Sequence, residues 1–467
     1  MPTILFVLVA FGIMTVQLFT QPIIGIADNT DFRRISAQVG ILQPYTYPQG
    51  FFEYAHIRFP FGKPEQIEYA SSELVFCRIA KILNRTFYSR ENFDIRFLGM
   101  IHACSYAACL FFFASILCLR PMAKSIFLAL MLFVLLDDRI ISYFNTFYSE
   151  SSSMIYLLLT VGFMLTFYPE KSTRTTTFIK LLSLVGASLL LSYSKTQNLI
   201  LLFPLWCFVV CIAWDKLNFR NDRYAWAVGS AFLMLGGVLF GIESRAFAAT
   251  KNTNIRVVLS EEIRPHSPDF ANDLRQLHAT KKDISRVTLL SISIFYARHP
   301  LRYLDLLERR AGKAFQHIPY GSYTEDNSHS PLEQSSKFNF WWQFKAKYFP
   351  RHLWFIFGTL TLASIFGIYN YLRAPRQFQS HIGLISTTLS FMAATAFIIA
   401  STFEANGPEK HLFMFNVLFD YVVAFSFLSL IYYVRPLRPY FHCYDRKRMV
   451  EQWGAGYSAQ SALSPDP

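Results

Sequence analysis

Charged residues are scarce in this sequence. Hydrophobic residues make up 53% of the chain and charged residues only 16%, whereas soluble domains carry roughly 25% charged residues. A single water-soluble core cannot hide that much apolar surface. The composition therefore excludes an ordinary soluble protein and predicts an integral membrane protein.

The cysteines show no pattern that would predict a disulfide-linked fold. The seven cysteines are an odd number, and several lie in apolar runs, where a thiol behaves as a small hydrophobic group. We therefore predict neither a disulfide framework nor a cysteine-based metal site. A net charge of +13 would point to nucleic acid in a soluble protein. In a membrane protein, the positions of the basic residues along the chain are first explained by the orientation of the loops across the bilayer. We therefore expect no nucleic-acid partner.

Long apolar runs are what the sequence does contain. A helix needs about 20 residues to cross the hydrocarbon layer. Ten runs reach or approach that length, near residues 4–24, 97–119, 123–141, 152–168, 177–193, 199–213, 224–243, 352–371, 381–402 and 411–433. The expected fold is an all-α integral membrane protein with about ten transmembrane helices. The first run lacks a basic start and a clear cleavage site, so we interpret it as a membrane anchor.

Positive charge orients these helices, because lysine and arginine in short loops stay on the cytoplasmic side. The short loops after runs three, five and nine carry only Arg139, Lys195 and Lys410, whereas the other short loops and the C-terminal tail hold clusters of basic residues. We therefore expect both termini in the cytoplasm and those three loops outside.

Two longer segments share the outer side. We divide the chain into an N-terminal transmembrane module (1–243) with an outer loop (25–96), an outer loop domain (244–350), C-terminal transmembrane helices (351–434) and a cytoplasmic tail (435–467). In IEYASSELVFCRIAKIL (67–83) and RYLDLLERRAGKAF (302–315) the apolar residues recur at helical spacing. This pattern predicts an amphipathic helix in each outer segment, the first of them lying on the membrane surface.

Four polar clusters fall at this outer boundary. They are ADNTDFRR (27–34), DDRIISYFNTFYSE (137–150), SYSKTQN (192–198) and FEANGPEKH (403–411). Each cluster taken alone reads as a solvated loop or a polar turn. Lys195 and Gln197 are harder to explain in that way, because they occupy a very short turn between two apolar helices.

The first cluster is the most specific. If the first helix persists for one more turn, Asp28 and Asp31 lie on one face and Arg33 and Arg34 follow within the next turn. Such a group either forms a salt-bridge network at a helix end or combines a proton-accepting carboxylate with cations that hold an anion. Glu150 either adds a further carboxylate or serves as a favourable acid at a helix N-terminus.

The last apolar run contains an ionisable residue deep in the bilayer. Asp420 lies nine residues beyond His411, about 14 Å along a helix, and Asn416 shares its face. Groups at that depth usually face a cavity or a partner. A buried hydrogen bond between helices is the alternative.

A carboxylate base with cations at a membrane surface suits the transfer of a group from a phosphate. A polyprenyl chain places its phosphate at headgroup depth, within reach of Asp28, Arg33, Lys195, Lys410 and His411 together. The arrangement resembles the GT-C superfamily of polyprenyl-phosphate-sugar-dependent glycosyltransferases, and most closely the WsfD-like bacterial glycan hexose transferases. The similar pieces are the first-loop pattern Asp28, Asn29, Asp31 and Phe32, FYSE (147–150), SKTQN (194–198), HPLRYLDLL (299–307) and HLFMFNVLFD (411–420).

The resemblance implies an inverting sugar transfer on the outer face of a bacterial inner (plasma) membrane, from a polyprenyl-phosphate-linked donor to a glycan or lipid-linked acceptor. Membrane lipid is the other expected partner. Asp28, as general base, and Asp31 are the implied catalytic residues. The implied substrate-binding residues are Arg33, Arg34, Glu150, Lys195, Gln197, Lys410, His411 and Asp420. The chain departs from the pattern at Thr30, where glycine is expected, and at Thr196, where proline is expected.

A metal ion is not part of the prediction. Some GT-C enzymes use a divalent metal, and Asp28, Asp31 and Glu150 are the oxygen ligands available for one, but no spacing demands it. Two other functions fit parts of the pattern. A transporter or flippase of lipid-linked glycan would be expected to show internal repeats, which we do not find. A polysaccharide polymerase or ligase has no evident need for an acidic pair after the first helix.

Overall fold

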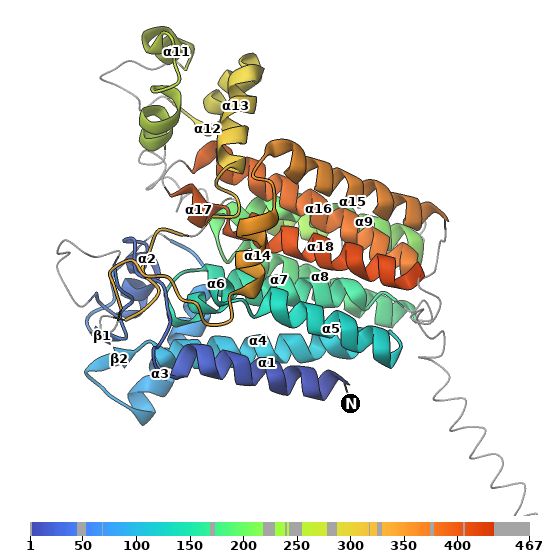
Figure 1. Cartoon of the computed structure of the whole chain (residues 1–467), viewed down its shortest axis with the longest axis horizontal. Coiled ribbons are helices and arrows are strands. Elements are labelled where there is room, and N and C mark those ends of the chain that lie inside the picture. Colours follow the sequence, from blue (N-terminus) through green and yellow to red (C-terminus); the bar gives the residue numbers. More distant parts are fainter. Residues whose placement is uncertain are drawn as a thin grey trace, which may run out of the picture.

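Helices dominate this molecule. The computed structural model describes residues 2–43, 53–67, 69–168, 173–217, 229–238, 241, 255–277, 287–316, 318–324, 329–373, 378–404 and 407–433. The long helices lie side by side in one bundle, and loops with short elements gather at one end of it (Figure 1). We call this end the loop-rich end; it includes residues 20–43, 53–67, 69–95, 136–149, 193–197 and 407–411.

The bundle confirms the expected all-α membrane fold. Its helices are α1 (Pro2–Phe19), α4 (Arg96–Ile116), α5 (Pro121–Leu135), α7 (Glu150–Leu165), α8 (Arg174–Ser192), α9 (Leu202–Leu217), α15 (Leu353–Arg373), α16 (Phe378–Phe403) and α18 (Phe413–Tyr433). Among the described residues, seven helices are long and apolar enough to cross a membrane, and α5, α7 and Gly229–Val238 are shorter apolar helices. Each expected run therefore contains an apolar helix. The expected tail, 435–467, lies outside the described residues.

The first membrane helix ends earlier than its apolar run. Helix α1 stops at Phe19, although the run continues to residue 24. Pro22 lacks a backbone N–H and cannot continue a helical ladder. The assumption that Asp28 and Asp31 share the face of a persisting helix is therefore wrong, because residues 20–32 are not helical.

Helix α16 lies at the centre of the second half of the bundle, where it packs against α9, α15 and α18. Gly367 of α15 and Gly383 of α16 let two backbones approach closely. A Cβ atom added at Gly367 would lie 2.5 Å from the Gly383 carbonyl oxygen, and one at Gly383 would lie 2.4 Å from the Gly367 oxygen. Small residues at such crossings are typical of packed membrane helices.

Short elements build the loop-rich end. They are α2 (Arg33–Ser36), η1 (Ala37–Val39), α3 (Glu73–Phe87), α6 (Asp138–Ile141), η2 (Ser142–Asn145) and a two-stranded antiparallel sheet of β1 (Arg58–Pro60) and β2 (Asn92–Asp94). Helix α3 falls inside the predicted amphipathic segment 67–83 and extends beyond it. It buries Phe76, Cys77 and Ala80 and exposes Val75 and Ile82.

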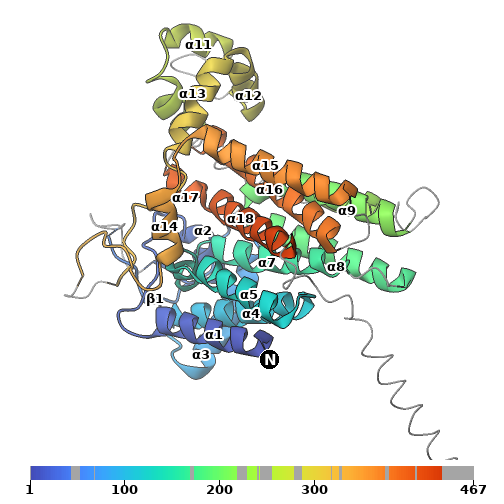
Figure 2. The ribbon, with the colours of Figure 1, turned by 45° about the vertical axis from the view of Figure 1, so that its right-hand side comes forward.

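The segment after the first half of the bundle contains a separate helical unit. The π-helix η4 (Val258–Ile263) and helices α11 (Phe270–Gln276), α12 (Leu289–Arg298) and α13 (Pro300–Ala311) share a small core of their own. The unit projects beside the bundle at the loop-rich end (Figures 1 and 2). Residues 318–324 then return to the first loop, where Tyr323 bridges to Ile24, and residues 329–339 lead into α14 (Phe340–Tyr348) and α15.

Candidate active site

The loop-rich end brings most of the predicted site residues together. The contributing segments are 27–34 after α1, 148–150 at the start of α7, the turn 193–197 between α8 and α9, and residues 404 and 407–411 between α16 and α18. The helix α17 (Pro408–His411) carries Lys410 and His411. Segments from both halves of the chain therefore meet in one polar cluster.

Aromatic packing fixes the first-loop motif. The ring of Phe32 is buried, and its centroid lies 4.7 Å from that of Tyr148 and 5.5 Å from that of Phe147. The Tyr148 hydroxyl lies 2.9 Å from the Ala27 carbonyl oxygen and 3.0 Å from the Asn29 side-chain oxygen, and it accepts the Asn29 backbone N–H. The FYSE segment thus positions the backbone around Asp28.

Lys410 is the buried cation of the cluster. Its ammonium forms an ion pair with Asp31, lies 3.1 Å from the Asn29 side-chain oxygen and stands 3.9 Å from the centre of the Tyr148 ring. Arg34 pairs with the other oxygen of Asp31 at 3.1 Å. Burial opposes the ionisation of Asp31, but Lys410 and Arg34 outweigh it and hold the pKa of this carboxyl well below its usual value.

Asp28 has a different environment. It is buried, and its carboxyl accepts the Phe32 backbone N–H at 3.1 Å and a hydrogen bond from the Gln43 side-chain amide. Burial, assisted by the negative charge of Asp31, raises the pKa of Asp28 to about 7, although the Phe32 N–H and Lys410 oppose this shift. This environment suits a group that gains or loses a proton near neutral pH.

A second ion pair lies beside the first. Lys195 donates to Glu150 at 2.8 Å, and the charge of Glu150 outweighs burial and raises the pKa of Lys195. Hydroxyl and amide contacts hold the two segments together. The Asn198 amide donates to Ser153 at 2.9 Å and to Ser194 at 3.0 Å. These bonds join the start of α7 to the turn that carries Lys195.

His411 is held among other polar groups. Its ring lies 3.1 Å from the Gln197 amide and 3.5 Å from a carboxylate oxygen of Glu404. Burial and the neighbouring cations Lys195 and Lys410 lower the pKa of His411 well below its usual value, whereas burial raises the pKa of Glu404. This shift favours the neutral imidazole, which can both donate and accept a hydrogen bond.

Two of the predicted site residues have other partners. Arg33 is exposed, and its guanidinium contacts Glu65 at 2.8 and 3.2 Å. Asp420 is buried in α18 and forms an ion pair of 2.7 Å with Lys345 of α14, whose ammonium lies 4.5 Å from the Trp342 ring centre. Asp420 therefore makes a buried contact between two helices, which was the alternative interpretation, and is not part of the polar cluster.

The carboxylates of the cluster do not suit a metal ion. Asp31 and Glu150 already face Lys410 and Lys195. Within the described part of the chain, no group of three or more His, Cys, Asp or Glu side chains is placed to hold a metal. The residues that were considered as oxygen ligands thus do not fit such a site, and we assign no chemical step to a metal.

Tyr320 is a site residue that the sequence did not reveal. Its hydroxyl accepts from the Asn29 amide at 3.3 Å, and the adjacent backbone pairs with the first loop, where the Ala27 N–H donates to the Gly321 carbonyl at 2.9 Å. A Cβ atom at Gly321 would lie 1.7 Å from the Glu53 carbonyl oxygen. The glycine in PYGSY (319–323) was the available signal, because only glycine permits this approach.

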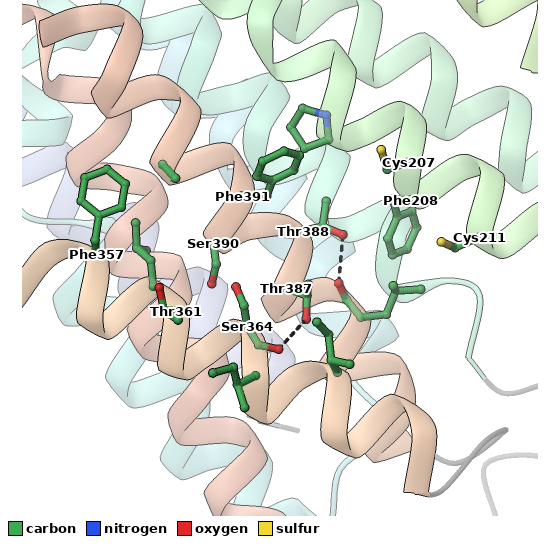
Figure 3. Close-up of a pocket in the computed structure, with 16 residues that line it drawn as sticks. Cys207, Phe208, Cys211, Phe357, Thr361, Ser364, Thr387, Thr388, Ser390 and Phe391 are labelled. Carbon is green, nitrogen blue, oxygen red and sulfur yellow. Dashed lines mark hydrogen bonds between the residues drawn. The ribbon is translucent and has the colours of Figure 1, made fainter. Parts of the chain in front are cut away.

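An apolar groove opens between α9, α15 and α16. It encloses about 420 Å³ and is lined by aromatic rings of Phe208, Phe357 and Phe391 together with several hydroxyl-bearing side chains (Figure 3). The hydroxyls of Thr387 and Thr388 donate to the backbone carbonyls of Ser364 and Leu384. These two hydroxyls are thus already hydrogen-bonded, and much of the remaining lining is apolar.

Fold and site together define a helical integral membrane protein with a buried, charged cluster at one end of its bundle. The chain belongs to the family described as the YfdI N-terminal transmembrane domain, whose family model matches residues 1–259 and 271–443. None of the curated proteins is significantly similar to it in sequence.

Solved structures offer more distant similarities. The oligosaccharyltransferase AglB of the archaeon Archaeoglobus fulgidus, in complex with an inhibitory peptide and a dolichol-phosphate, shares 13% identity at a TM-score of 0.44 over 100% of this chain and 52% of that chain. The apo form of the Archaeoglobus fulgidus oligosaccharyltransferase gives 12% identity and a TM-score of 0.42, over 92% of this chain and 50% of that chain. The chain spans about half the length of these proteins.

Proposed function

We propose that this protein is a membrane glycosyltransferase of the GT-C type, which moves a sugar from a polyprenyl-phosphate donor to a hydroxyl group of a glycan or lipid-linked acceptor with inversion. The observation that carries the proposal is the position of Asp28, a carboxyl with a pKa near neutrality, beside a cluster of buried cations. The first-loop and later motifs that resemble GT-C enzymes support the same activity.

Asp28 acts as the general base in this mechanism. The acceptor hydroxyl replaces the Gln43 amide at the Asp28 carboxylate and gives up its proton there. The resulting oxygen attacks the anomeric carbon while the bond from that carbon to the phosphate oxygen breaks. Polyprenyl phosphate leaves with the bonding electrons. A base is most effective when its pKa lies near the working pH, and Asp28 meets this condition.

The cations stabilise the departing phosphate. Lys195, Lys410 and Arg34 outnumber Asp31 and Glu150, the carboxylates that form ion pairs with them. A phosphate oxygen bound here can accept charge-assisted hydrogen bonds from these cations. Asp31 is too acidic to serve as a base, so we assign it the role of holding Lys410 and Arg34 in place. Gln197 and His411 supply hydrogen bonds beside Lys195.

The groove of Figure 3 provides a place for the polyprenyl chain. We place the loop-rich end on the outer side of a bacterial inner membrane and both termini in the cytoplasm, because basic residues concentrate in the loops at the opposite end. The phosphate then lies at headgroup depth in the outer leaflet, where the sugar meets an outer-face acceptor.

Transfer in detergent solution tests the proposal. Purified protein is supplied with a panel of polyprenyl-phosphate hexoses and lipid-linked glycan acceptor, and the products are analysed by mass. One added hexose is expected. The exposed carboxylate of Asp305 on α13 offers a matched control, Asp305→Asn, which should leave transfer unchanged. Absence of transfer from every donor would overturn the proposal in favour of a transporter, and joining of whole glycan blocks would indicate a polymerase or ligase.

A further inference from the structure

The helical unit formed by η4, α11, α12 and α13 exposes apolar side chains that do not pack in its own core. On α13, Leu301 and Leu304 are 80% and 51% exposed, while Leu306 and Leu307 on another side are buried. The neighbouring α12 likewise exposes Leu290 and buries Ile292. Single exposed leucines are common on protein surfaces. Neighbouring helices that each carry a second apolar side indicate a contact surface.

Contacts at Glu308 show where the exposed side of α13 faces. Leu301, Leu304 and Glu308 lie on one side of this helix, because they are separated by three and four residues. Glu308 accepts the backbone N–H of Leu353 at 2.8 Å and contacts the His352 ring at 2.7 Å, at the start of the membrane helix α15. The exposed leucines therefore lie on the side of α13 turned toward the end of a membrane span.

Aromatic residues mark the membrane boundary at the same place. Trp354, in the first turn of α15, is 68% exposed. Helix α14, which precedes it, exposes Phe340, Phe344 and Tyr348, each four residues from the next. Exposed tryptophan and tyrosine at the ends of membrane helices are typical of the headgroup region. Figure 2 shows α13 next to the start of α15, so the leucines of α13 continue this boundary.

The unit is fixed at this level by polar contacts to the bundle. The hydroxyl groups of Tyr303 and Thr402 lie 3.1 Å apart and join α13 to the end of α16. Lys313 forms an ion pair of 3.1 Å with Glu409 of α17, next to Lys410. These contacts set the position of α13 relative to the bilayer without any help from the exposed leucines.

We propose that the helical unit rests on the lipid surface, with Leu301 and Leu304 of α13 inserted into the boundary between headgroups and acyl chains. The occupant of this apolar side is thus the outer leaflet of the same membrane that the bundle spans, and not a second protein. Amphipathic helices bind bilayers in this way, with the apolar side buried to a shallow depth. The inference does not depend on the enzymatic activity.

Photocrosslinking of the full chain tests this contact. A benzophenone amino acid is placed at Leu301, at Leu304 or, as a control, at exposed Asn272 on α11, the helix of the unit drawn farthest from α15 in Figure 1. The protein is reconstituted in nanodiscs of phosphatidylethanolamine and phosphatidylglycerol. We expect phospholipid adducts by mass spectrometry at positions 301 and 304 and none at 272. Adducts to a second protein chain, or no lipid adduct at 301 and 304, would overturn the proposal.

A second measurement avoids the bulky probe. The double substitution Leu301→Gln and Leu304→Gln keeps good helix formers on α13 but removes its apolar side. In the same nanodiscs we expect faster amide hydrogen exchange across α12 and α13 and unchanged exchange in α16. Unchanged exchange in α13 would show that the leucines make no stabilising contact with lipid.

Discussion

Asp28 and Asp31 stand three positions apart in one loop, yet the protein moves their pKa values in opposite directions. Burial raises the pKa of Asp28 to about 7, whereas Lys410 and Arg34 overcome burial and keep Asp31 ionised. The same loop thus holds one group suited to exchange a proton and one suited to hold cations. Groups whose environments push their pKa values apart often take different roles in catalysis.

Replacement of these two carboxyls should separate their roles. Asp28→Asn retains the size of the side chain but removes the proton acceptor, so we expect kcat to fall by roughly 100-fold or more. Asp31→Asn should have a milder effect on kcat and a larger one on the KM for donor, because it releases Lys410. Steady-state transfer kinetics measure both. Full activity of Asp28→Asn would eliminate Asp28 as the base.

The activity should follow the ionisation of Asp28. The carboxylate is the active form, so kcat/KM should rise with pH below about 7 and level off above it. Because the charge of Asp31 helps to raise the pKa of Asp28, Asp31→Asn should move this inflection to lower pH. A pH profile of the wild type and this variant measures the shift. An unmoved inflection in Asp31→Asn would argue against Asp28 as the titrating group.

The ionisation of Asp28 should also affect the stability of the protein, but stability should fall with rising pH where activity rises. The pKa of Asp28 is higher in the folded than in the unfolded chain, so the folded state retains a proton that the unfolded state has lost between about pH 4 and 7. Stability from this group is present below the unfolded pKa and declines as pH rises through the folded pKa. Asp28→Asn should therefore raise the melting temperature more at pH 7.5 than at pH 4.5, by thermal unfolding in detergent.

Lys195 should contribute to donor binding. In Lys195→Ala a bound phosphate loses a charge-assisted hydrogen bond, typically worth roughly 1.5–3 kcal/mol. Binding of polyprenyl phosphate, followed by microscale thermophoresis, should weaken accordingly. Lys347→Ala on α14 is the control, since that lysine lies beside the Tyr348 ring and away from the cluster. Equal affinity of a folded Lys195→Ala variant would restrict Lys195 to its structural contact with Glu150.

Thr30 offers a test of local strain. Its φ of 83° lies in the left-handed region, where a branched side chain is unfavourable and glycine is not. We expect Thr30→Gly to raise the free energy of unfolding by about 1 kcal/mol, the usual scale of such strain. Thr30→Ala should gain less, because alanine keeps the Cβ atom. Melting temperatures of the two variants provide the comparison, and destabilisation by glycine would contradict this explanation.

The membrane fold and most of the cluster followed from the sequence, because apolar length and loop charge identify membrane helices directly. The same signals placed Lys195, Gln197, Lys410 and His411 at one end of the bundle. The contact of Lys345 with Asp420 was not predictable, since Lys345 lies in a long segment without a distinctive pattern. The contact of Tyr320 with Asn29 was missed, although the neighbouring glycine in PYGSY was a signal for it. The end of α1 was misplaced because the apolar run continues past the helix.

The contact between Asp31 and Lys410 joins residues that are 379 positions apart in the chain. During synthesis, the loop that carries Asp28 and Asp31 is made long before the ribosome reaches α17. Asp31 therefore cannot form its ion pair with Lys410 until the segment that carries α17 has been made. A chain interrupted before residue 410 still contains Asp31 and Arg34, but it lacks the ammonium that pairs with Asp31 and stands over the Tyr148 ring. The full set of ion pairs in the cluster therefore forms only after α17 has been synthesised.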